Sequence, residues 1–199
     1  MWKRIVSSLV GVSLILCGFV GVSKLKERLP MQEPIEVETV KDAPAGARMP
    51  KAAFEVAAKG AVLIDAESGE VLFEQDAHKE LPLASVTKVM TMLLVMEAVD
   101  SGKITLDDSV TISERAASMG GSQMYMEAGE THTVAELMEG VAMASANDGC
   151  VALSEFVAGS EEIFVERMNE RAAELGMRDT HFVNTNGLPV AGHYSSAYD

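Results

Sequence analysis

The chain has 199 residues, of which 48% are hydrophobic, 23% charged and 5% aromatic. This length suits one domain of ordinary size, and the composition excludes a wholly disordered chain. The formal net charge is −14, and because the first 28 residues carry +4, the remainder carries −18. A body this acidic repels phosphate backbones, which argues against a nucleic-acid partner.

The N-terminus has the pattern of an exported protein. Lys3 and Arg4 precede an uncharged stretch of 18 residues, 5–22, which is typical of a secretory signal peptide and also reaches the lower limit for a membrane-spanning helix. Residues 1–23 are therefore predicted to be a signal peptide, cleaved after Ser23, or an uncleaved membrane anchor. Either alternative places the body outside the cytoplasm.

An extended linker is predicted over 24–51, because this region holds four of the six prolines and shows neither a helical nor a strand period. The folded part is predicted to cover 52–199. It begins with two apolar runs, 61–65 and 70–74, on either side of Glu-Ser-Gly, a pattern that predicts a β-hairpin.

Four helices are expected after the hairpin. Apolar residues recur through 86–99 so densely that we expect a helix buried on most sides. A second helix is predicted over 133–145, where Thr133 and Glu136 form a capping box, and a third over 147–157.

The fourth helix is predicted to be capped by Ser160 and to end at Gly176. Its inward face is expected to consist of Phe164, Met168, Ala172 and Leu175. Its acidic residues are interpreted as a solvated face; they are Glu161, Glu162 and Glu166.

The predicted elements are one hairpin and four helices, so the hairpin has no further strands to pair with. An isolated two-stranded hairpin is only marginally stable. We therefore expect further strands beyond Asp199, so that the chain stops within a domain. Of the two cysteines, Cys17 lies in the N-terminal apolar stretch, so the body contains only Cys150. A single cysteine excludes both a disulfide within the domain and a cysteine-rich zinc site. The four histidines lack metal-ligand spacing, so we expect neither a metal nor a cofactor.

The chemical signal is the pair Ser85 and Lys88. Residues three apart lie on one face of a helix, so the lysine amine is expected within reach of the hydroxyl. A serine hydroxyl needs a base to become a nucleophile, and a lysine is a base only when burial or a second cation keeps it neutral. The apolar neighbours of this pair favour burial, although an N-cap role for Ser85 explains the pattern as well.

A second polar element, Ser145-Ala146-Asn147, follows 60 residues after Ser85, between two predicted helices. A second hydroxyl can relay a proton between Lys88 and a leaving amine. The Asn147 side chain can hold a substrate carbonyl and contact the lysine. Capping at a helix junction is the alternative for both residues.

Residues 84–91, ASVTKVMT, closely resemble the active-site segment of the low-molecular-mass penicillin-binding proteins, the D-alanyl-D-alanine carboxypeptidases. Residues 145–147, SAN, resemble the S-x-N motif of that family, and residues 181–188, HFVNTNGL, resemble another stretch typical of it. Residues 193–199, HYSSAYD, are similar to its H-x-S-T-A-x-D run, with Ser196 where threonine is usual.

The resemblance implies an α/β (α+β) fold of the β-lactamase/transpeptidase type, with a helical subdomain and an antiparallel sheet flanked by helices. Residues 52–199 would then be the N-terminal part of a catalytic domain whose sheet is incomplete in this fragment. The K-T-G motif of the family does not occur in the chain, so we expect residues 1–199 alone to be inactive or nearly so.

The resemblance also implies an acyl-transfer mechanism in which Ser85 is the nucleophile, Lys88 its base, Ser145 a proton relay and Asn147 a substrate-binding residue. The implied substrate is a peptidoglycan stem peptide ending in D-Ala-D-Ala, and the implied covalent inhibitors are β-lactams. The implied location is outside the cytoplasm of a bacterium, at the membrane or wall, with membrane contact through the N-terminal segment if it is uncleaved.

Three alternatives remain. A class A β-lactamase usually has aspartate where this chain has Ala146, and no E-x-x-L-N follows. A D,D-endopeptidase or transpeptidase shares the motifs. A non-catalytic β-lactam sensor or cell-wall-binding module would bind penicillin and release no D-alanine.

Overall fold

The computed structural model describes residues 56–199. The predicted signal peptide or anchor, 1–23, and the predicted linker, 24–51, lie outside the described residues. Within the part that is described, no helix combines the length and the apolarity needed to cross a membrane.

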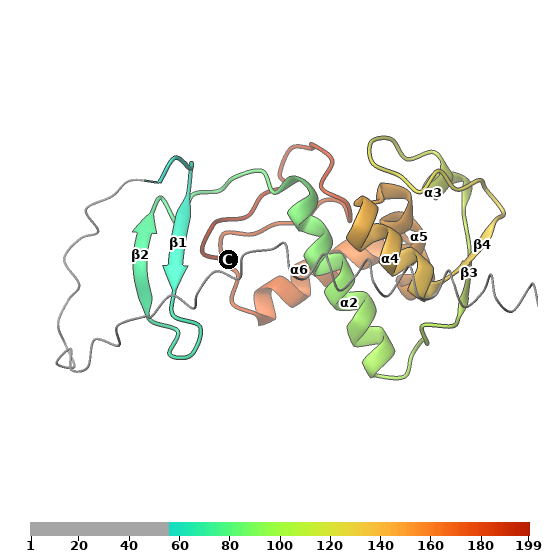
Figure 1. Ribbon diagram of the computed structural model, residues 1–199, viewed down its shortest axis with the longest axis horizontal. Coiled ribbons are helices and arrows are strands. Elements are labelled where there is room, and N and C mark those ends of the chain that lie inside the picture. Colours follow the sequence, from blue (N-terminus) through green and yellow to red (C-terminus); the bar gives the residue numbers. More distant parts are fainter. Residues whose placement is uncertain (1–55) are drawn as a thin grey trace, which may run out of the picture. The chain divides into compact units, whose positions relative to one another are not determined.

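The predicted hairpin is confirmed. Strand β1 (Ala61–Ile64) pairs antiparallel with β2 (Val71–Gln75), with Ala61 opposite Gln75. The Asp65 carboxylate accepts hydrogen bonds from the backbone N–H and the hydroxyl of Ser68, which fixes the connecting turn. In Figure 1 the two strands form a separate ribbon pair beside the C-terminal segment.

The first helix, predicted over 86–99, is confirmed with slightly different bounds. A 3₁₀ turn, η1 (Ala84–Thr87), continues directly into α2 (Lys88–Asp100). The expected burial on most sides is wrong, because Val86 and Val89 are 64% and 62% exposed. Only the face that carries Lys88, Thr91 and Val95 is buried, so the apolar density of the sequence overstated how much of this helix packs.

Helices α4 (Val134–Ala144), α5 (Asn147–Ala158) and α6 (Glu161–Glu174) confirm the next three helices. The capping box of α4 is formed as predicted, with Thr133 and Glu136 exchanging hydrogen bonds. Helix α5 packs against α2, α3, α4 and α6, and residues 147–154 are all buried. A helix surrounded in this way is buried on nearly every side, so α5 forms the centre of the group of helices (Figure 1).

The inward face of α6 differs from the prediction at both ends. Phe164, Met168 and Ala172 are buried as expected, but Leu175 is 49% exposed. Glu161, expected on a solvated face, is 4% exposed. Its carboxylate is buried because a cation and a threonine from other parts of the chain reach it.

Three short elements have no counterpart among the predicted ones. They are β3 (Ser109–Thr111), α3 (Glu114–Ala117) and β4 (Thr131–Thr133). Strands β3 and β4 pair antiparallel, with Val110 opposite His132. Elements of three or four residues are too short to show a hydrophobic period.

The C-terminal segment returns to the start of η1. Leu81 pairs with Ser195, and His181 pairs with Tyr194, both as isolated antiparallel bridges. Residues 181–195 therefore lie beside the turn that carries Ser85. Whether further strands complete the sheet stays a prediction.

We expect Thr133→Ala to lower the free energy of unfolding by about 1 kcal/mol, because the substitution leaves the Glu136 N–H without its cap. Urea denaturation measures this loss. Glu139→Ala, an exposed change inside the same helix, is the control and should stay within about 0.5 kcal/mol of wild type. Equal effects for the two substitutions would contradict the capping role.

Candidate active site

Ser85 lies in η1 directly after Ala84, a residue with φ of +47°. An alanine in the left-handed region is strained by about 1 kcal/mol or more, and such strain persists where surrounding contacts impose it. The Ser85 side chain stands at the surface, whereas Thr87 and Lys88 on the same turn are buried. The turn therefore presents one hydroxyl outward above a buried amine.

Lys88 is 3% exposed at the first position of α2. Its Nζ lies 3.0 Å from Ser85 Oγ and donates a hydrogen bond to the Asn186 carbonyl oxygen at 2.7 Å. Burial lowers the pKa of Lys88, because a charged amine loses its hydration there. A Cys150 thiolate would oppose this shift, but burial raises the pKa of Cys150 to about 12, so the nearby thiol is neutral at ordinary pH.

Ser145 reaches the same hydroxyl from the other side. It ends α4 in the left-handed conformation, with φ of 56° and ψ of 40°, and so forms the junction with α5. Its Oγ lies 3.0 Å from Ser85 Oγ and donates a hydrogen bond to it. The structure thus brings together three of the four site residues expected from sequence: Ser85, Lys88 and Ser145.

Asn147 is placed differently from the other three. Its side-chain amide donates to the Gly120 carbonyl at 2.7 Å, and its backbone N–H donates to Ser122 O at 2.8 Å. The hydrogen bonds of Lys88 within residues 56–199 go to Ser85 and Asn186, so the expected link from Asn147 to the lysine is not formed. Its predicted role in holding a substrate carbonyl stays a prediction, since the side-chain amide keeps a second N–H donor.

The neighbouring Asp148 fixes the loop that Asn147 touches. Its buried carboxylate accepts the backbone N–H groups of Met124 at 3.0 Å and Tyr125 at 3.0 Å. An acidic residue in the first turn of a helix also interacts favourably with the positive end of the helix dipole. Asp148 was not expected at the site, and its position next to the S-x-N motif is the signal that points to it.

The segment 184–187 supplies contacts that the sequence did not reveal. The Asn186 carbonyl forms the shorter of the two hydrogen bonds of Lys88. Gly187 approaches Ala84 so closely that a Cβ added to Gly187 would lie 1.8 Å from the Ala84 oxygen. Backbone groups of this kind have no residue signature, so only the HFVNTNGL resemblance could have drawn attention to them.

A buried histidine links this segment to η1. His193 Nδ1 accepts from the Val183 N–H at 3.0 Å, which leaves Nε2 to donate to Thr87 Oγ1 at 2.7 Å. Burial, aided by the charge of His181, lowers the pKa of His193. The imidazole is therefore a neutral structural link between the nucleophile turn and the C-terminal segment.

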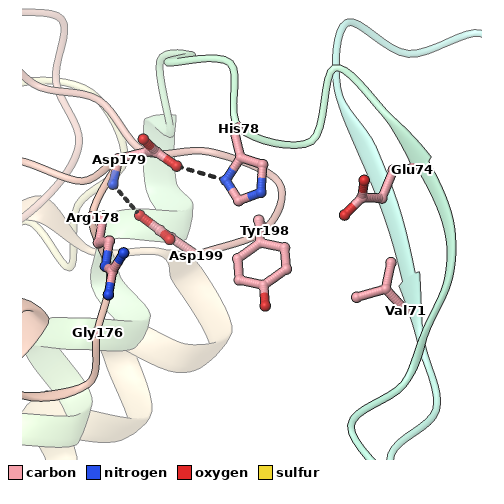
Figure 2. A pocket seen from close by; sticks show the side chains of 8 residues that line it. All are labelled: Val71, Glu74, His78, Gly176, Arg178, Asp179, Tyr198 and Asp199. Carbon is pink, nitrogen blue, oxygen red and sulfur yellow. Dashed lines mark hydrogen bonds and ion pairs between the residues drawn. The ribbon is translucent and has the colours of Figure 1, made fainter.

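A cavity of about 630 Å³ lies elsewhere, between the hairpin and the C-terminal residues. Figure 2 shows His78 beside Asp179 at one side of it, with Glu74 and Val71 at the other. The His78 Nδ1 to Asp179 Oδ2 distance is 2.8 Å, and the Tyr198 ring lies beside the imidazole. None of the four expected site residues lines this cavity. It is not the place where the serine chemistry would occur.

The site geometry defines a class of protein. A serine hydroxyl held between a buried amine and a second hydroxyl is the arrangement of a serine acyl-transfer site that uses lysine as its base. Within the described residues, the Ser-Lys-Ser cluster joins the start of α2, the α4–α5 junction and the segment at Asn186. Lys88 and Ser145 thus converge on Ser85 Oγ, and the Asn186 carbonyl holds the lysine amine from a third part of the chain.

The sequence profile of the D-alanyl-D-alanine carboxypeptidases matches residues 46–199, so the chain belongs to that family. It is 56% identical over 142 residues to D-alanyl-D-alanine carboxypeptidase DacF of Bacillus subtilis, covering 71% of this chain and 36% of that protein. It is 40% identical over 151 residues to DacD of Escherichia coli, covering 73% of this chain and 39% of that protein. The chain thus spans less than two fifths of either relative.

Solved structures agree with this assignment. DacD of Francisella tularensis superposes with a TM-score of 0.72 at 35% identity, over 78% of this chain and 38% of that one. Penicillin binding protein 6B of Escherichia coli superposes with a TM-score of 0.69 at 39% identity, over 72% of this chain and 47% of that one. The expected β-lactamase/transpeptidase-like fold, with helices and small antiparallel sheets, is confirmed.

We expect Gly187→Ala to lower the free energy of unfolding by about 3 kcal/mol or more, since the new Cβ would collide with the Ala84 carbonyl. The matched control is Gly192→Ala. Gly192 also has a positive φ, of +83°, but the nearest atom to its added Cβ is 3.8 Å away, so only backbone strain of about 1 kcal/mol applies. Chemical denaturation measures both values, and similar losses would show that the close approach is unimportant.

Proposed function

We propose that the protein containing this chain is a serine D-alanyl-D-alanine carboxypeptidase that removes the terminal D-alanine from peptidoglycan stem pentapeptides. The observation that carries the proposal is the position of Ser85 Oγ, 3.0 Å from Lys88 Nζ and 3.0 Å from Ser145 Oγ. Membership of the carboxypeptidase family supports the substrate. The proposed catalytic domain includes residues 52–199.

In the first half of the reaction, Ser85 Oγ forms a bond to the carbonyl carbon between the two D-alanines. Its proton passes to Lys88, which must be neutral to accept it, and burial favours that state by lowering the pKa of the amine. The Ser85 N–H, in the first turn of a helix, is available to hold the oxyanion. One such donor is worth about 3 kcal/mol in the transition state.

In the second half, the C–N bond breaks and the departing D-alanine amine needs a proton. Lys88 supplies it through Ser145, whose hydroxyl already bonds to Ser85 Oγ. Water then attacks the acyl carbonyl carbon and gives a proton to Lys88. When the ester C–O bond breaks, Lys88 returns that proton to Ser85 Oγ, so both residues regain their starting states. Asn147 is proposed to orient the substrate carbonyl through the second N–H of its side-chain amide, because the first N–H donates to the Gly120 carbonyl.

β-Lactams are proposed as covalent inhibitors that acylate Ser85 and leave slowly. Penicillin-binding protein D2 of Listeria monocytogenes, solved in an ampicillin-bound form, is 31% identical to the chain with a TM-score of 0.64. The basic and apolar pattern of residues 1–23 supports export from a bacterial cytoplasm, so that the enzyme meets peptidoglycan at the membrane or wall.

We expect a penicillin to add its full mass to Ser85 of the intact protein, because the strained lactam opens on the activated hydroxyl. Intact-mass spectrometry followed by peptide mapping locates the adduct. Ser85→Ala should carry no adduct, whereas Ser122→Ala, a change at another exposed serine, should label normally. An adduct that survives Ser85→Ala would contradict the nucleophile assignment.

D-alanine release from a pentapeptide separates the remaining possibilities. The proposed carboxypeptidase releases D-alanine and hydrolyses a chromogenic cephalosporin slowly. Fast cephalosporin turnover would indicate a β-lactamase instead. An adduct on Ser85 without D-alanine release would indicate a β-lactam sensor.

We expect the acylation rate of the intact protein to rise with pH and to level off above the pKa of Lys88, because only the neutral amine accepts the Ser85 proton. Since burial lowers that pKa, the rise should lie below the ordinary lysine value of about 10.4. Stopped-flow with a fluorescent penicillin measures the profile. Lys88→Ala should slow acylation at least about 100-fold, and the exposed control Lys79→Ala should not change it.

A further inference from the structure

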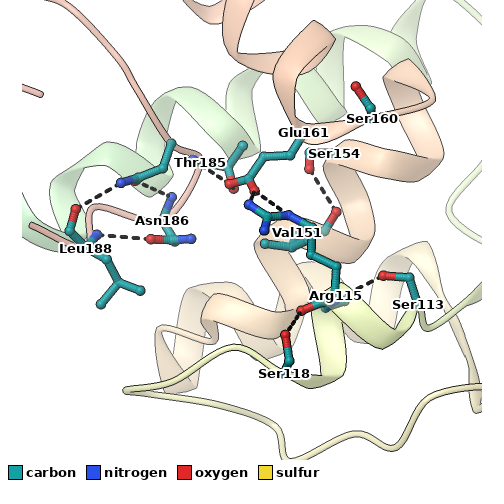
Figure 3. A network of polar contacts seen from close by, with 12 residues as sticks. Ser113, Arg115, Ser118, Val151, Ser154, Ser160, Glu161, Thr185, Asn186 and Leu188 are labelled. Atoms are coloured by element: carbon teal, nitrogen blue, oxygen red, sulfur yellow. Dashed lines mark hydrogen bonds and ion pairs between the residues drawn. The ribbon is translucent and has the colours of Figure 1, made fainter. Parts of the chain in front are cut away.

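Glu161, the first residue of α6, is an acidic residue that the proposed reaction does not use and that is nevertheless 4% exposed. Its Oε2 accepts hydrogen bonds from the Arg115 guanidinium, including one from Nε at 3.1 Å. Its Oε1 accepts from the Thr185 hydroxyl at 2.9 Å and from the Thr185 backbone N–H at 3.3 Å. Figure 3 shows the carboxylate between the arginine and the threonine.

These contacts use every polar group of Thr185. Its N–H and hydroxyl go to Glu161, and its carbonyl accepts the Thr91 hydroxyl of α2 at 2.6 Å. Thr185 is fully buried, so it cannot exchange these partners for water. The carboxylate therefore fixes the residue that directly precedes Asn186.

The next carbonyl along the chain, Asn186 O, is the 2.7 Å acceptor of Lys88. A neutral amine has two N–H donors and one lone pair. When one N–H is held by a fixed carbonyl, rotation about the Cε–Nζ bond is restricted, and the lone pair can be kept toward Ser85 Oγ at 3.0 Å. The position of that carbonyl thus determines how the base faces the nucleophile.

We propose that Glu161 is a positioning residue for Lys88, acting through Thr185 and the Asn186 carbonyl; this rests on the proposed serine chemistry. The carboxylate does not touch the reacting atoms. It holds the carbonyl that orients the amine, and Arg115 balances its charge.

The burial of a carboxylate supports a role beyond packing. Removing an ionised group from water is costly, and well-packed apolar residues often stabilise a site of this kind as well or better. A carboxylate oxygen, however, accepts two donors from one residue at once, which a hydrophobic side chain does not do. Glu161 therefore gives Thr185 a fixed position rather than extra apolar contact.

The test compares variants of the intact protein by the acylation of Ser85 with a fluorescent penicillin. The concentration dependence of stopped-flow traces separates the dissociation constant from the acylation rate constant. Glu161→Leu removes both acceptors of Thr185. Glu161→Gln keeps an oxygen that can accept from Thr185, because the partly exposed Arg115 side chain can turn toward water.

We expect Glu161→Leu to lower the acylation rate constant at least tenfold, since a shift of about 1 Å in catalytic geometry can cost up to 100-fold. The dissociation constant should change less than twofold, because Glu161 does not face the ligand. Glu161→Gln should restore the rate to within about threefold of wild type. Met168→Ala, a core change in the same helix, should lower the unfolding midpoint without slowing acylation.

If Glu161→Leu does not fold, Thr185→Val takes its place, because it deletes the hydroxyl donor and keeps the shape. It should slow acylation about threefold or more. The inference is overturned if the variant reacts at the wild-type rate, if the loss lies in the dissociation constant, if glutamine rescues nothing, or if Met168→Ala is slowed equally. Wild-type protein that takes up no penicillin overturns the proposed function itself, and the inference with it.

Discussion

A lysine amine buried beside a serine hydroxyl is the interaction around which the site is built. Nζ of Lys88 has two partners, Ser85 Oγ at 3.0 Å and Asn186 O at 2.7 Å, and almost no access to water. Burial makes the charged amine unfavourable, so the same environment that holds the side chain also lowers its pKa. Geometry and basicity therefore have one cause.

The surrounding fold supplies what this pair needs. The buried helix α5 contacts four other helices, and its N-terminal junction holds Ser145 in a left-handed conformation. The His193–Thr87 hydrogen bond and the Gly187–Ala84 approach fix the C-terminal segment on η1. The left-handed conformations of Ala84 and Ser145 persist where neighbouring groups hold them: Gly187 packs against Ala84, and the Ser145 hydroxyl is bonded to Ser85.

Much of this could be expected from sequence, because it depends on local patterns. The hairpin followed from two apolar runs around a turn, and α4 followed from a capping box. The proximity of Ser85 and Lys88 followed from their spacing of three along a helical turn. The approach of Ser145 came from the family resemblance, since no local rule joins residues 60 positions apart.

Other features could not be predicted, because they depend on tertiary partners. Glu161 looks like a solvated first-turn acid until Arg115, 46 residues away, and Thr185 are placed against it. The Asn186 carbonyl is a backbone group and has no residue signature. The exposed face of α2 also differed from expectation, since apolar density does not say how many neighbours a helix finds.

Titration of Lys88 itself tests whether burial keeps this amine neutral. Carbon-13 labelling of the lysine ε-carbons and NMR at increasing pH would follow each amine, and the spectrum of Lys88→Ala would identify the resonance of Lys88. We expect Lys88 to lose its proton at a clearly lower pH than the exposed Lys79. A Lys88 resonance that titrates together with Lys79 would contradict it, because the amine would then be charged when Ser85 must be activated.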